Sequence, residues 1–358
     1  MIRRLAFVAP WAALLALVVS WDRPLNGLTL GIDLVLLAIT IVAAVYHAEI
    51  VAHRVGEPFG TLILAVAVTV IEVALIVAVM ISAGPEPSSL ARDTVFSAVM
   101  ITCNGIIGVA LLTAAFRHHI PTFNAEGSGA AIATVAALAT LTLVVPAYTT
   151  TTSGPTLSGG QLAYASLASL SLYGLFVFVQ AIRHRDYFVV GDTAGDQGAT
   201  LTEAVPSKRE AVTSLVLLLV ALVAIVGLAK TVSPNIEQGI DAAGLPASFV
   251  GVVIAFLILL PEGAAAVRAA WGNQMQSSLN LALGSAMASI GLTIPVIAVL
   301  SQIIDTPLLL GLAPVQVVLF ALTMFVAALT ITPGRSTVMQ GGVHLVLFAG
   351  FVVLSASP

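Results

Sequence analysis

The chain has 358 residues, of which 59% are hydrophobic and only 8% are charged, about a third of the charged fraction of an ordinary soluble domain. That composition excludes a water-soluble globule and indicates a protein that lies in a lipid bilayer. The formal net charge of -4 includes no basic tract that would neutralise a run of phosphates, so we expect no nucleic-acid partner, and the single Cys103 excludes a disulfide framework and a cysteine-ligated metal site.

Apolar stretches of roughly 20 residues, the length of a membrane-spanning helix, follow one another along the chain between polar or Pro/Gly-marked interruptions. About eleven of them lie near 4–21, 28–52, 59–82, 94–116, 129–148, 161–182, 211–232, 247–270, 277–300, 307–330 and 337–356. The first has the basic-then-apolar character of a signal peptide, but it meets Trp21, Asp22 and Arg23 rather than a small-residue cleavage site. We therefore expect it to be a retained membrane helix, and the whole chain to be an all-α polytopic membrane protein.

A hydrophilic segment at 183–210, rich in Gly, Asp and Thr, divides the chain and is typical of a linker on the membrane surface. It leaves one leading helix in 1–27, five helices in 28–182 and five in 211–358. Because five is an odd number, the second set enters the membrane in the opposite orientation, as in the inverted repeats of secondary transporters. The sequence thus predicts a 1+5+5 architecture with a binding site near the midplane.

Basic residues concentrate on one side of the predicted spans. If the N-terminus lies in the cytoplasm, the outer side holds only Arg23, Arg92 and Lys230. Because Lys and Arg near helix ends resist translocation, this pattern predicts a cytoplasmic N-terminus and linker and a C-terminus outside.

Two glutamates interrupt otherwise apolar spans, at a cost of roughly 2.5–3.5 kcal/mol each on insertion scales. Glu72 lies in the third span and Glu262, directly after Pro261, in the eighth. These are the second helices of the two sets of five, so the two carboxyls are expected at inverted but equivalent depths. Pro261 would supply a helix break beside Glu262. No Pro or Gly near Glu72 supports a break in the third span.

Small polar side chains near these glutamates are candidate supporting ligands. They are Thr69, Ser97, Asn104, Ser285 and Ser289. Ser97 and Asn104 recur on one helical face of the fourth span, with Thr102 beside it, and Ser278, Ser285, Ser289 and Thr293 recur on one face of the ninth. The alternative role of such residues is to pack membrane helices closely.

Carboxylates, an amide and hydroxyls match the oxygen ligands that Ca²⁺ prefers. His47 and His53 lie at a helix end and His344 stands alone in the last span, so a zinc or copper site is not expected. A buried, unpaired carboxyl holds its proton, whereas a divalent cation displaces protons. The site would therefore hold one Ca²⁺ or two H⁺ but not both, and it would need no resident cofactor.

At this point two segments resemble a known family. HAEIVAHRVGEPFGTLILAVAVTVIEVALIVAVM and PEGAAAVRAAWGNQMQSSLNLALGSAMASIGLTIPV are similar to the repeats of the Ca²⁺/H⁺ antiporters of the cation/calcium exchanger superfamily, most closely the bacterial ones. The resemblance implies that Glu72 and Glu262 are the two essential acidic ligands. It further implies that Asn104 is the amide of the first repeat, and that Gly284 with Ser285 is the Gly-Ser of the second.

The resemblance also implies an antiporter that exports Ca²⁺ in exchange for H⁺ across a bacterial inner membrane. The approach sequences TVIE and LLPE depart from the usual pattern of the superfamily, so exchange of Na⁺ or K⁺ for H⁺ by the same fold stays open. A cation channel, which would lack coupling to pH, is a third reading. No GxSxG, HExxH or phosphate-loop motif is present, so we expect no enzyme. Oligomeric state stays open.

Glu49, His53 and Glu57 are spaced four residues apart and would share one face at the cytoplasmic end of the second span. Since histidine titrates near neutral pH, this group is a candidate proton access point or pH sensor. The alternative is an ordinary interfacial ion-pair stripe.

Overall fold

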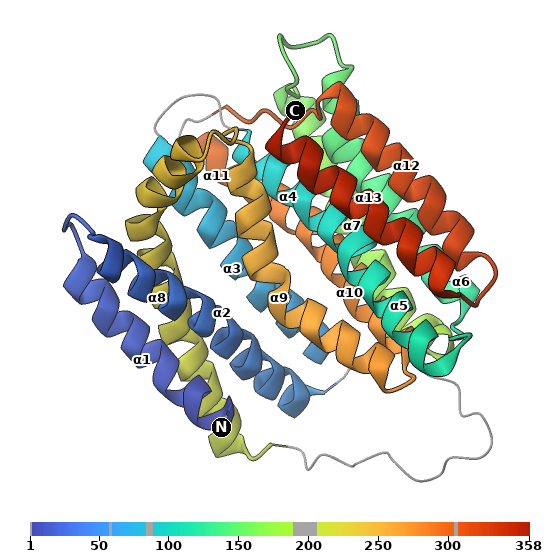
Figure 1. Cartoon of the computed structure of the whole chain (residues 1–358), viewed down its shortest axis with the longest axis horizontal. Coiled ribbons are helices and arrows are strands. Elements are labelled where there is room, and N and C mark those ends of the chain that lie inside the picture. Colours follow the sequence, from blue (N-terminus) through green and yellow to red (C-terminus); the bar gives the residue numbers. More distant parts are fainter. Residues whose placement is uncertain (1, 57–58, 84–88, 189–205, 304–306) are drawn as a thin grey trace.

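The computed structural model describes residues 2–56, 59–83, 89–188, 206–303 and 307–358. The α-helices are α1 Ile2–Ser20, α2 Gly27–Val55, α3 Phe59–Ala83, α4 Leu90–Met100, α5 Ile107–His118, α6 Ala125–Ala139, α7 Gly159–Phe178, α8 Lys208–Ala242, α9 Phe249–Trp271, α10 Met275–Gly291, α11 Thr293–Ile303, α12 Pro314–Ile331 and α13 Val338–Ala356. Short π or 3-10 segments are η1 Ile101–Ile106, η2 Thr140–Val144, η3 Val145–Ala147, η4 Val179–Arg183 and η5 Arg185–Tyr187. Figure 1 shows the N-terminus and the start of α8 at one end of the helical bundle and the C-terminus at the other.

The helices are long and apolar enough to cross a bilayer. Within the described residues, ten helical segments meet that length and composition, and α3 adds a shorter apolar stretch at Ile63–Ala78. The predicted all-α polytopic membrane fold is confirmed. Two spans are less regular than predicted. The π-helix η1 joins α4 to α5, and an interruption at Leu292 separates α10 from α11.

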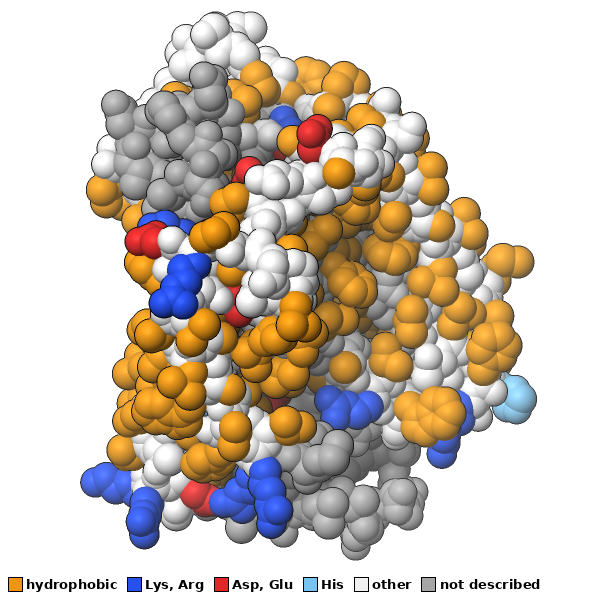
Figure 2. Space-filling model, turned by 60° about the vertical axis from the view of Figure 1, so that its left-hand side comes forward, with side chains coloured by type: hydrophobic (Ala, Val, Ile, Leu, Met, Phe, Trp, Pro, Cys, Tyr) orange, Lys and Arg blue, Asp and Glu red, His pale blue; other side chains and the backbone are white. Residues whose placement is uncertain are grey.

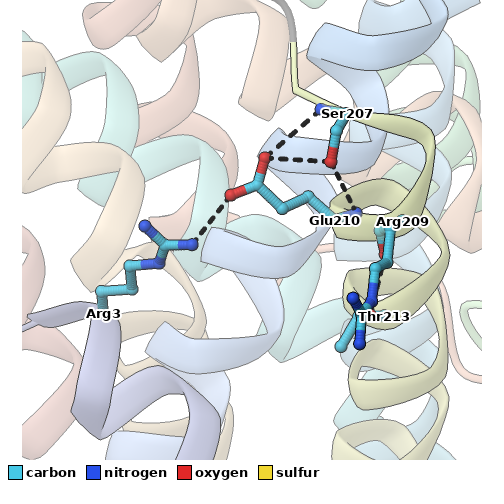
Figure 3. A network of polar contacts seen from close by, with 5 residues as sticks. All are labelled: Arg3, Ser207, Arg209, Glu210 and Thr213. Carbon is cyan, nitrogen blue, oxygen red and sulfur yellow. Dashed lines mark hydrogen bonds and ion pairs between the residues drawn. The ribbon is translucent and has the colours of Figure 1, made fainter.

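Side-chain caps fix where several helices begin. The Ser207 hydroxyl accepts from the backbone N–H of Glu210, whose carboxylate accepts from the backbone N–H of Ser207, so α8 starts at Lys208. Figure 3 shows that the same carboxylate also meets Arg3 of α1, at an Oε1 to Nη2 distance of 2.8 Å. Both partners are exposed, so this ion pair adds little stability, but it places the start of α1 beside the start of α8.

Besides a small cluster of Ala6, Ala9 and Ala43 between α1 and α2, two large hydrophobic cores organise the described part of the bundle. The smaller, here called the α2–α8 core, combines buried residues of α1, α2, α3, α8 and α9. The larger, the α4–α13 core, combines α3 and α9 with the remaining spans. Ile71 of α3 and Ile258 of α9 belong to the first core, whereas Ile76 and Leu259 belong to the second. Helices α3 and α9 therefore stand between two packed bodies and contribute one face to each.

The outer surface is apolar, as a lipid-facing surface requires. In Figure 2 hydrophobic side chains are spread over the middle of the face drawn, and lysine and arginine side chains lie mostly along its lower edge, with others at its upper left. Large exposed residues such as Leu15, Leu219, Phe325 and Val346 lie on different helices around the bundle. In a membrane these side chains would contact the hydrocarbon of the lipids and not water.

Candidate functional site

The two intramembrane glutamates occupy matching positions on the two helices that stand between the cores. Glu72 is residue 14 of α3, counted from Phe59, and Glu262 is residue 14 of α9, counted from Phe249. At about 1.5 Å of rise per residue, each lies roughly 20 Å from the start of its helix. The two helices contact each other, and Glu262 lies close enough for its charge to act on Glu72.

The carboxyl of Glu72 is buried, with 1% of the residue exposed, and a hydroxyl group binds it. The Thr293 hydroxyl donates to its Oε2 at 2.9 Å. Ser289, one turn earlier along the same span, also lies close to this carboxyl. Hydrogen bonds to a carboxylate are stronger than neutral ones, so Thr293 holds the side chain of Glu72 in place.

The interruption between α10 and α11 explains how Thr293 reaches Glu72. Pro295 lies in the first turn of α11 and has no N–H to donate to the carbonyl of Gly291. The α-helix accordingly stops at Gly291 and resumes at Thr293. A Cβ at Gly291 would lie 2.8 Å from the Tyr173 side chain, so the small residue there lets α10 approach α7.

Glu262 has a different environment from Glu72. The residue is partly exposed, yet its Oε2 is buried and has no hydrogen-bond partner among the described residues. Next to it, a Cβ at Gly263 would lie 3.3 Å from the side chain of Ile106, so α9 packs closely on η1 at this level. An unpartnered buried carboxyl oxygen is costly, and it marks a position that a proton or a cation would fill.

The helix breaks considered from the sequence are absent beside both glutamates. α9 runs without interruption through Pro261, which corrects the expectation of a break there. α3 is also continuous around Glu72. A membrane helix tolerates the single backbone hydrogen bond that proline removes when neighbouring helices pack around it.

The candidate proton access residues lie on the last turns of α2. Glu49 and His53 are both within α2, and both are exposed. The charge of Glu49 acts on Glu262, so this exposed carboxylate lies within electrostatic range of the buried site. Glu57 lies outside the described residues.

The other predicted ligands divide into two groups. Thr69 lies one turn before Glu72, and its buried hydroxyl has no partner among the described residues, whereas Ser285 is half-buried on α10. Ser97 instead donates to the backbone carbonyl of Asp93 in its own helix. Asn104 is directed to α12 and α13, where its amide binds Thr323 and His344. Thr69, Ser285 and Ser289 thus remain available to the glutamates, and the amide of Asn104 is already bound elsewhere.

Thr293 and Thr102 are candidate site residues outside the set predicted from the sequence. The chain carries a signal for Thr102, because VMITCNGIIGV at 99–109 and AMASIGLTIPV at 286–296 share Met, Ile and Val at corresponding places and a hydroxyl two residues after the Met. The signal for Thr293 is its spacing of four residues from Ser289, which puts both on one helical face. In this correspondence Thr102 stands where Ser289 stands. Its Oγ1 is buried without a partner among the described residues, on the segment η1 that packs against α9.

An ion pair and hydrogen bonds join residues at the start of α4, at the end of the bundle that holds the C-terminus. Arg92 binds the buried carboxylate of Asp93 at 2.8 Å, and its Nη1 donates to the carbonyl of Gly311 at 3.1 Å. The Ser89 hydroxyl donates to the other carboxylate oxygen at 2.8 Å. A cavity of about 370 Å³ lies there, lined by Asp93 and Ser97 among others, and this ion pair bridges its wall.

The assembled groups are hard oxygen ligands. Within the described part of the chain, no three or more His, Cys, Asp or Glu side chains gather in one place. Two carboxyls and the hydroxyls of Ser289 and Thr293 suit an alkali or alkaline-earth cation or protons rather than a soft transition metal.

Comparison with known proteins identifies the family. The model of the family described as "Sodium/calcium exchanger protein" matches residues 25–182 and 213–356. The chain is 45% identical over 323 residues to y4hA of Sinorhizobium fredii, whose name proposes an ionic transporter, covering 90% of this chain and 87% of y4hA. It is 31% identical over 311 residues to the sodium-potassium/proton antiporter ChaA of Escherichia coli, covering 87% and 84% of the two chains.

Solved structures show the same fold at low sequence identity. YfkE superposes with a TM-score of 0.70 at 15% identity, covering 99% of each chain. The H⁺/Ca²⁺ exchanger CAX superposes with a TM-score of 0.69 at 14% identity, covering 98% of this chain and 87% of CAX. The family match spans most of the chain, and two bacterial relatives align along nearly its whole length. The chain therefore belongs to the sodium/calcium exchanger protein family of multi-pass membrane ion transporters.

Proposed function

We propose that this protein is a secondary antiporter that exports Ca²⁺ in exchange for H⁺ at a site between Glu72 and Glu262. The observation that carries the proposal is the pairing of these carboxyls at residue 14 of two helices that stand between separate cores. Thr69, Ser285, Ser289, Thr293 and Thr102 would supply neutral oxygens around the ion. The matching positions also support an inverted repeat of residues 28–182 and 211–358 after a leading helix, with 183–210 as the linker.

Charge neutrality explains why the exchange would be coupled. Two carboxylates neutralise one Ca²⁺ in a site shielded from water. When the cation leaves, two buried negative charges would remain at a cost of several kcal/mol each unless protons replace the cation. The protein would therefore not change between its two orientations with an empty, doubly charged site. The site must hold either the cation or the protons each time it changes sides.

Motion of the α2–α8 core against the α4–α13 core would expose the site alternately to the two sides. The exposed Glu49, coupled to Glu262, supports access from the end where α2 finishes. The Arg92 ion pair and its bond to Gly311 support closure at the opposite end. With the positive-inside orientation, access is from the cytoplasm of a bacterial cell and closure is on the outer side of its inner membrane.

Exchange of Na⁺ or K⁺ for H⁺ is a second candidate. The identity of 31% to ChaA over 87% of this chain favours it, because that protein is named a sodium-potassium/proton antiporter. A monovalent cation would leave one of the two carboxyls protonated in the loaded state, so the two candidates differ in the number of protons exchanged per cation, two for Ca²⁺ and one for Na⁺ or K⁺.

An ion panel in everted membrane vesicles tests the proposal. Vesicles containing the protein are acidified inside by respiration, and Ca²⁺, Na⁺ and K⁺ are then added separately at several pH values. We expect Ca²⁺ to dissipate the pH gradient, and vesicles without the protein to give no response. A response to Na⁺ or K⁺ alone would establish the second candidate, and cation uptake with no pH response would indicate a channel.

Replacing Thr293 by valine tests whether the hydroxyl bound to Glu72 serves the cation. We expect Thr293→Val to raise the KM for the transported cation about tenfold, because it removes one oxygen ligand and one hydrogen bond to a charged group, worth roughly 1.5–3 kcal/mol. KM is measured from initial rates in the same vesicles. Thr142→Val is the matched control, since Thr142 is equally buried but donates only to the carbonyl of Leu138. Equal KM values for the two variants would exclude Thr293 from the site.

A further inference from the structure

A buried polar network lies behind the glutamate site and has no part in the proposed exchange. Its centre is His344 of α13, which is fully buried, with Asn104 of η1 on one side and Thr330 of α12 on the other. The Nδ1 of His344 lies 3.2 Å from the Oδ1 of Asn104, and its Nε2 lies 3.1 Å from the Oγ1 of Thr330.

The hydrogen-bond directions in this network are determined by the partners of Asn104. Its Nδ2 donates to the Oγ1 of Thr323 at 2.9 Å, and the Thr323 hydroxyl is directed to the sulfur of Met100 at 3.6 Å. The amide oxygen of Asn104 therefore faces His344, which assigns the proton of the neutral ring to Nδ1. The hydroxyl of Thr330 then donates to Nε2. Every polar atom of the Asn104 side chain has a partner, so the position of this residue is specified by α12 and α13.

The segment that this network holds is the π-helix η1. Its wide turn leaves backbone groups without their usual i→i−4 partner, and such segments persist only when surrounding structure stabilises them. η1 packs on α9 and α10 on one side and on α12 and α13 on the other. On the second side a Cβ at Gly105 would lie 3.3 Å from the ring of Phe348, so α13 fits closely against η1.

Thr102 lies on the opposite side of η1 from Asn104. Residues two apart in a helix point in nearly opposite directions. Because His344 and Thr323 bind Asn104 toward α12 and α13, Thr102 is directed toward the helices α9 and α10 that carry Glu262 and Ser289. Its unpartnered hydroxyl is a candidate oxygen for the cation.

We propose that His344 is a positioning residue of the cation site: by binding Asn104, it holds the π-helical register that turns Thr102 toward Glu262. This inference rests on the proposed exchange at Glu72 and Glu262. His344 itself touches neither the cation nor the glutamates. Replacing His344 would let η1 rotate and so lower the affinity for the cation. The maximal rate of exchange would change much less.

Two substitutions at His344 separate the Nδ1 contact from simple filling of space. The amide nitrogen of asparagine occupies nearly the place of Nδ1, so His344→Asn keeps the donor to Asn104. His344→Leu fills the space and removes both hydrogen bonds. We expect His344→Leu to raise the KM for the cation about tenfold while the maximal rate per folded protein stays within about twofold, and His344→Asn to stay near the parent KM. Unchanged KM in His344→Leu, or an equal increase in both variants, would overturn the proposal.

His47 provides the matched control for burial and chemistry. It is also a fully buried histidine in a membrane span, and its Nε2 lies 3.1 Å from the carbonyl of Ala6, at the contact of α1 with α2. His47→Leu is expected to lower thermal stability and to leave the KM unchanged. A rise in KM equal to that of His344→Leu would mean that any buried histidine has this effect, and the proposal would fall.

If His344→Leu does not fold, Thr330→Val removes only the partner of Nε2 and keeps the volume of the side chain. It is expected to raise the KM about threefold, and an unchanged KM would count against the proposal. Glu72→Gln and Glu262→Gln are measured in the same vesicles. Loss of exchange in these variants with no effect at His344 refutes the positioning role alone, whereas exchange that survives in them refutes the proposed function itself.

Discussion

Glu72→Gln and Glu262→Gln are each expected to reduce proton-coupled cation exchange about a hundredfold or more. Glutamine keeps the size of the side chain but cannot carry the negative charge that offsets the cation or take up the proton that replaces it. If the loss of one of the two charged ligands weakens the binding free energy of the cation by about 2.7 kcal/mol, the affinity already falls a hundredfold. A neutral side chain inserts into the bilayer more readily than an ionisable one, so the loss is not expected to reflect failed insertion.

Initial rates of pH-gradient dissipation in everted vesicles, normalised to the amount of inserted protein, measure this effect. Glu210→Gln serves as the control, because Glu210 is an exposed acid that meets Arg3 at the start of α8, far from the site. It should exchange at the rate of the parent. If the double variant Glu72→Gln and Glu262→Gln exchanged at the rate of the parent, the site would lie elsewhere.

Gly341→Val is expected to destabilise the folded protein by roughly 1–3 kcal/mol or more, because it overpacks the contact between α13 and α5. A Cβ at Gly341 would lie 2.8 Å from the backbone nitrogen of Leu112 and 3.1 Å from the carbonyl oxygen of Gly108. Backbone atoms cannot rotate away as a side chain can, so the two helices must separate. In lipid, close approach at small residues provides much of the attraction between helices.

The neighbouring Gly342 is the matched control on the same helix, since a Cβ there would meet no atom within 4 Å. Gly342→Val should leave stability within about 0.5 kcal/mol of the parent. The melting temperature of each variant is measured by heating the purified protein in detergent and following the loss of its monodisperse peak in size-exclusion chromatography. Equal melting temperatures for the two would show that α13 does not depend on this close contact.

The position of the two glutamates was accessible from the sequence for a simple reason. A charge in an apolar span is expensive, so Glu72 and Glu262 stood out from their surroundings, and the division of the spans placed them on corresponding helices. The structure places both at residue 14 of their helices. Their direct partners were only partly accessible. Periodicity puts Thr293 on the polar face of the ninth span, but hydroxyl residues are common in membrane helices and most of them serve packing.

Asn104 shows where helical periodicity was insufficient. A repeat of 3.6 residues put it on one face with Ser97, and the family resemblance assigned it to the cation. The π-helical turn of η1 holds more residues per turn, so side chains after Ile101 are rotated relative to that periodicity. The amide consequently meets Thr323 and His344 instead. His344 itself had no partner within its own helix, and its partners come from two other spans.

The amino-acid sequence by itself determined that this protein lies in a membrane, how its chain divides into spans, and which two acids are out of place among apolar residues. These properties follow from composition, from the length of apolar stretches and from the cost of charge in hydrocarbon. Only the tertiary structure decided that Thr293 rather than Ser97 binds a glutamate, that α9 continues through Pro261, and that α3 and α9 separate two cores. Contacts between helices in lipid depend on shape and close packing at particular residues. The hydrophobic pattern of the sequence does not determine which helices pack against each other.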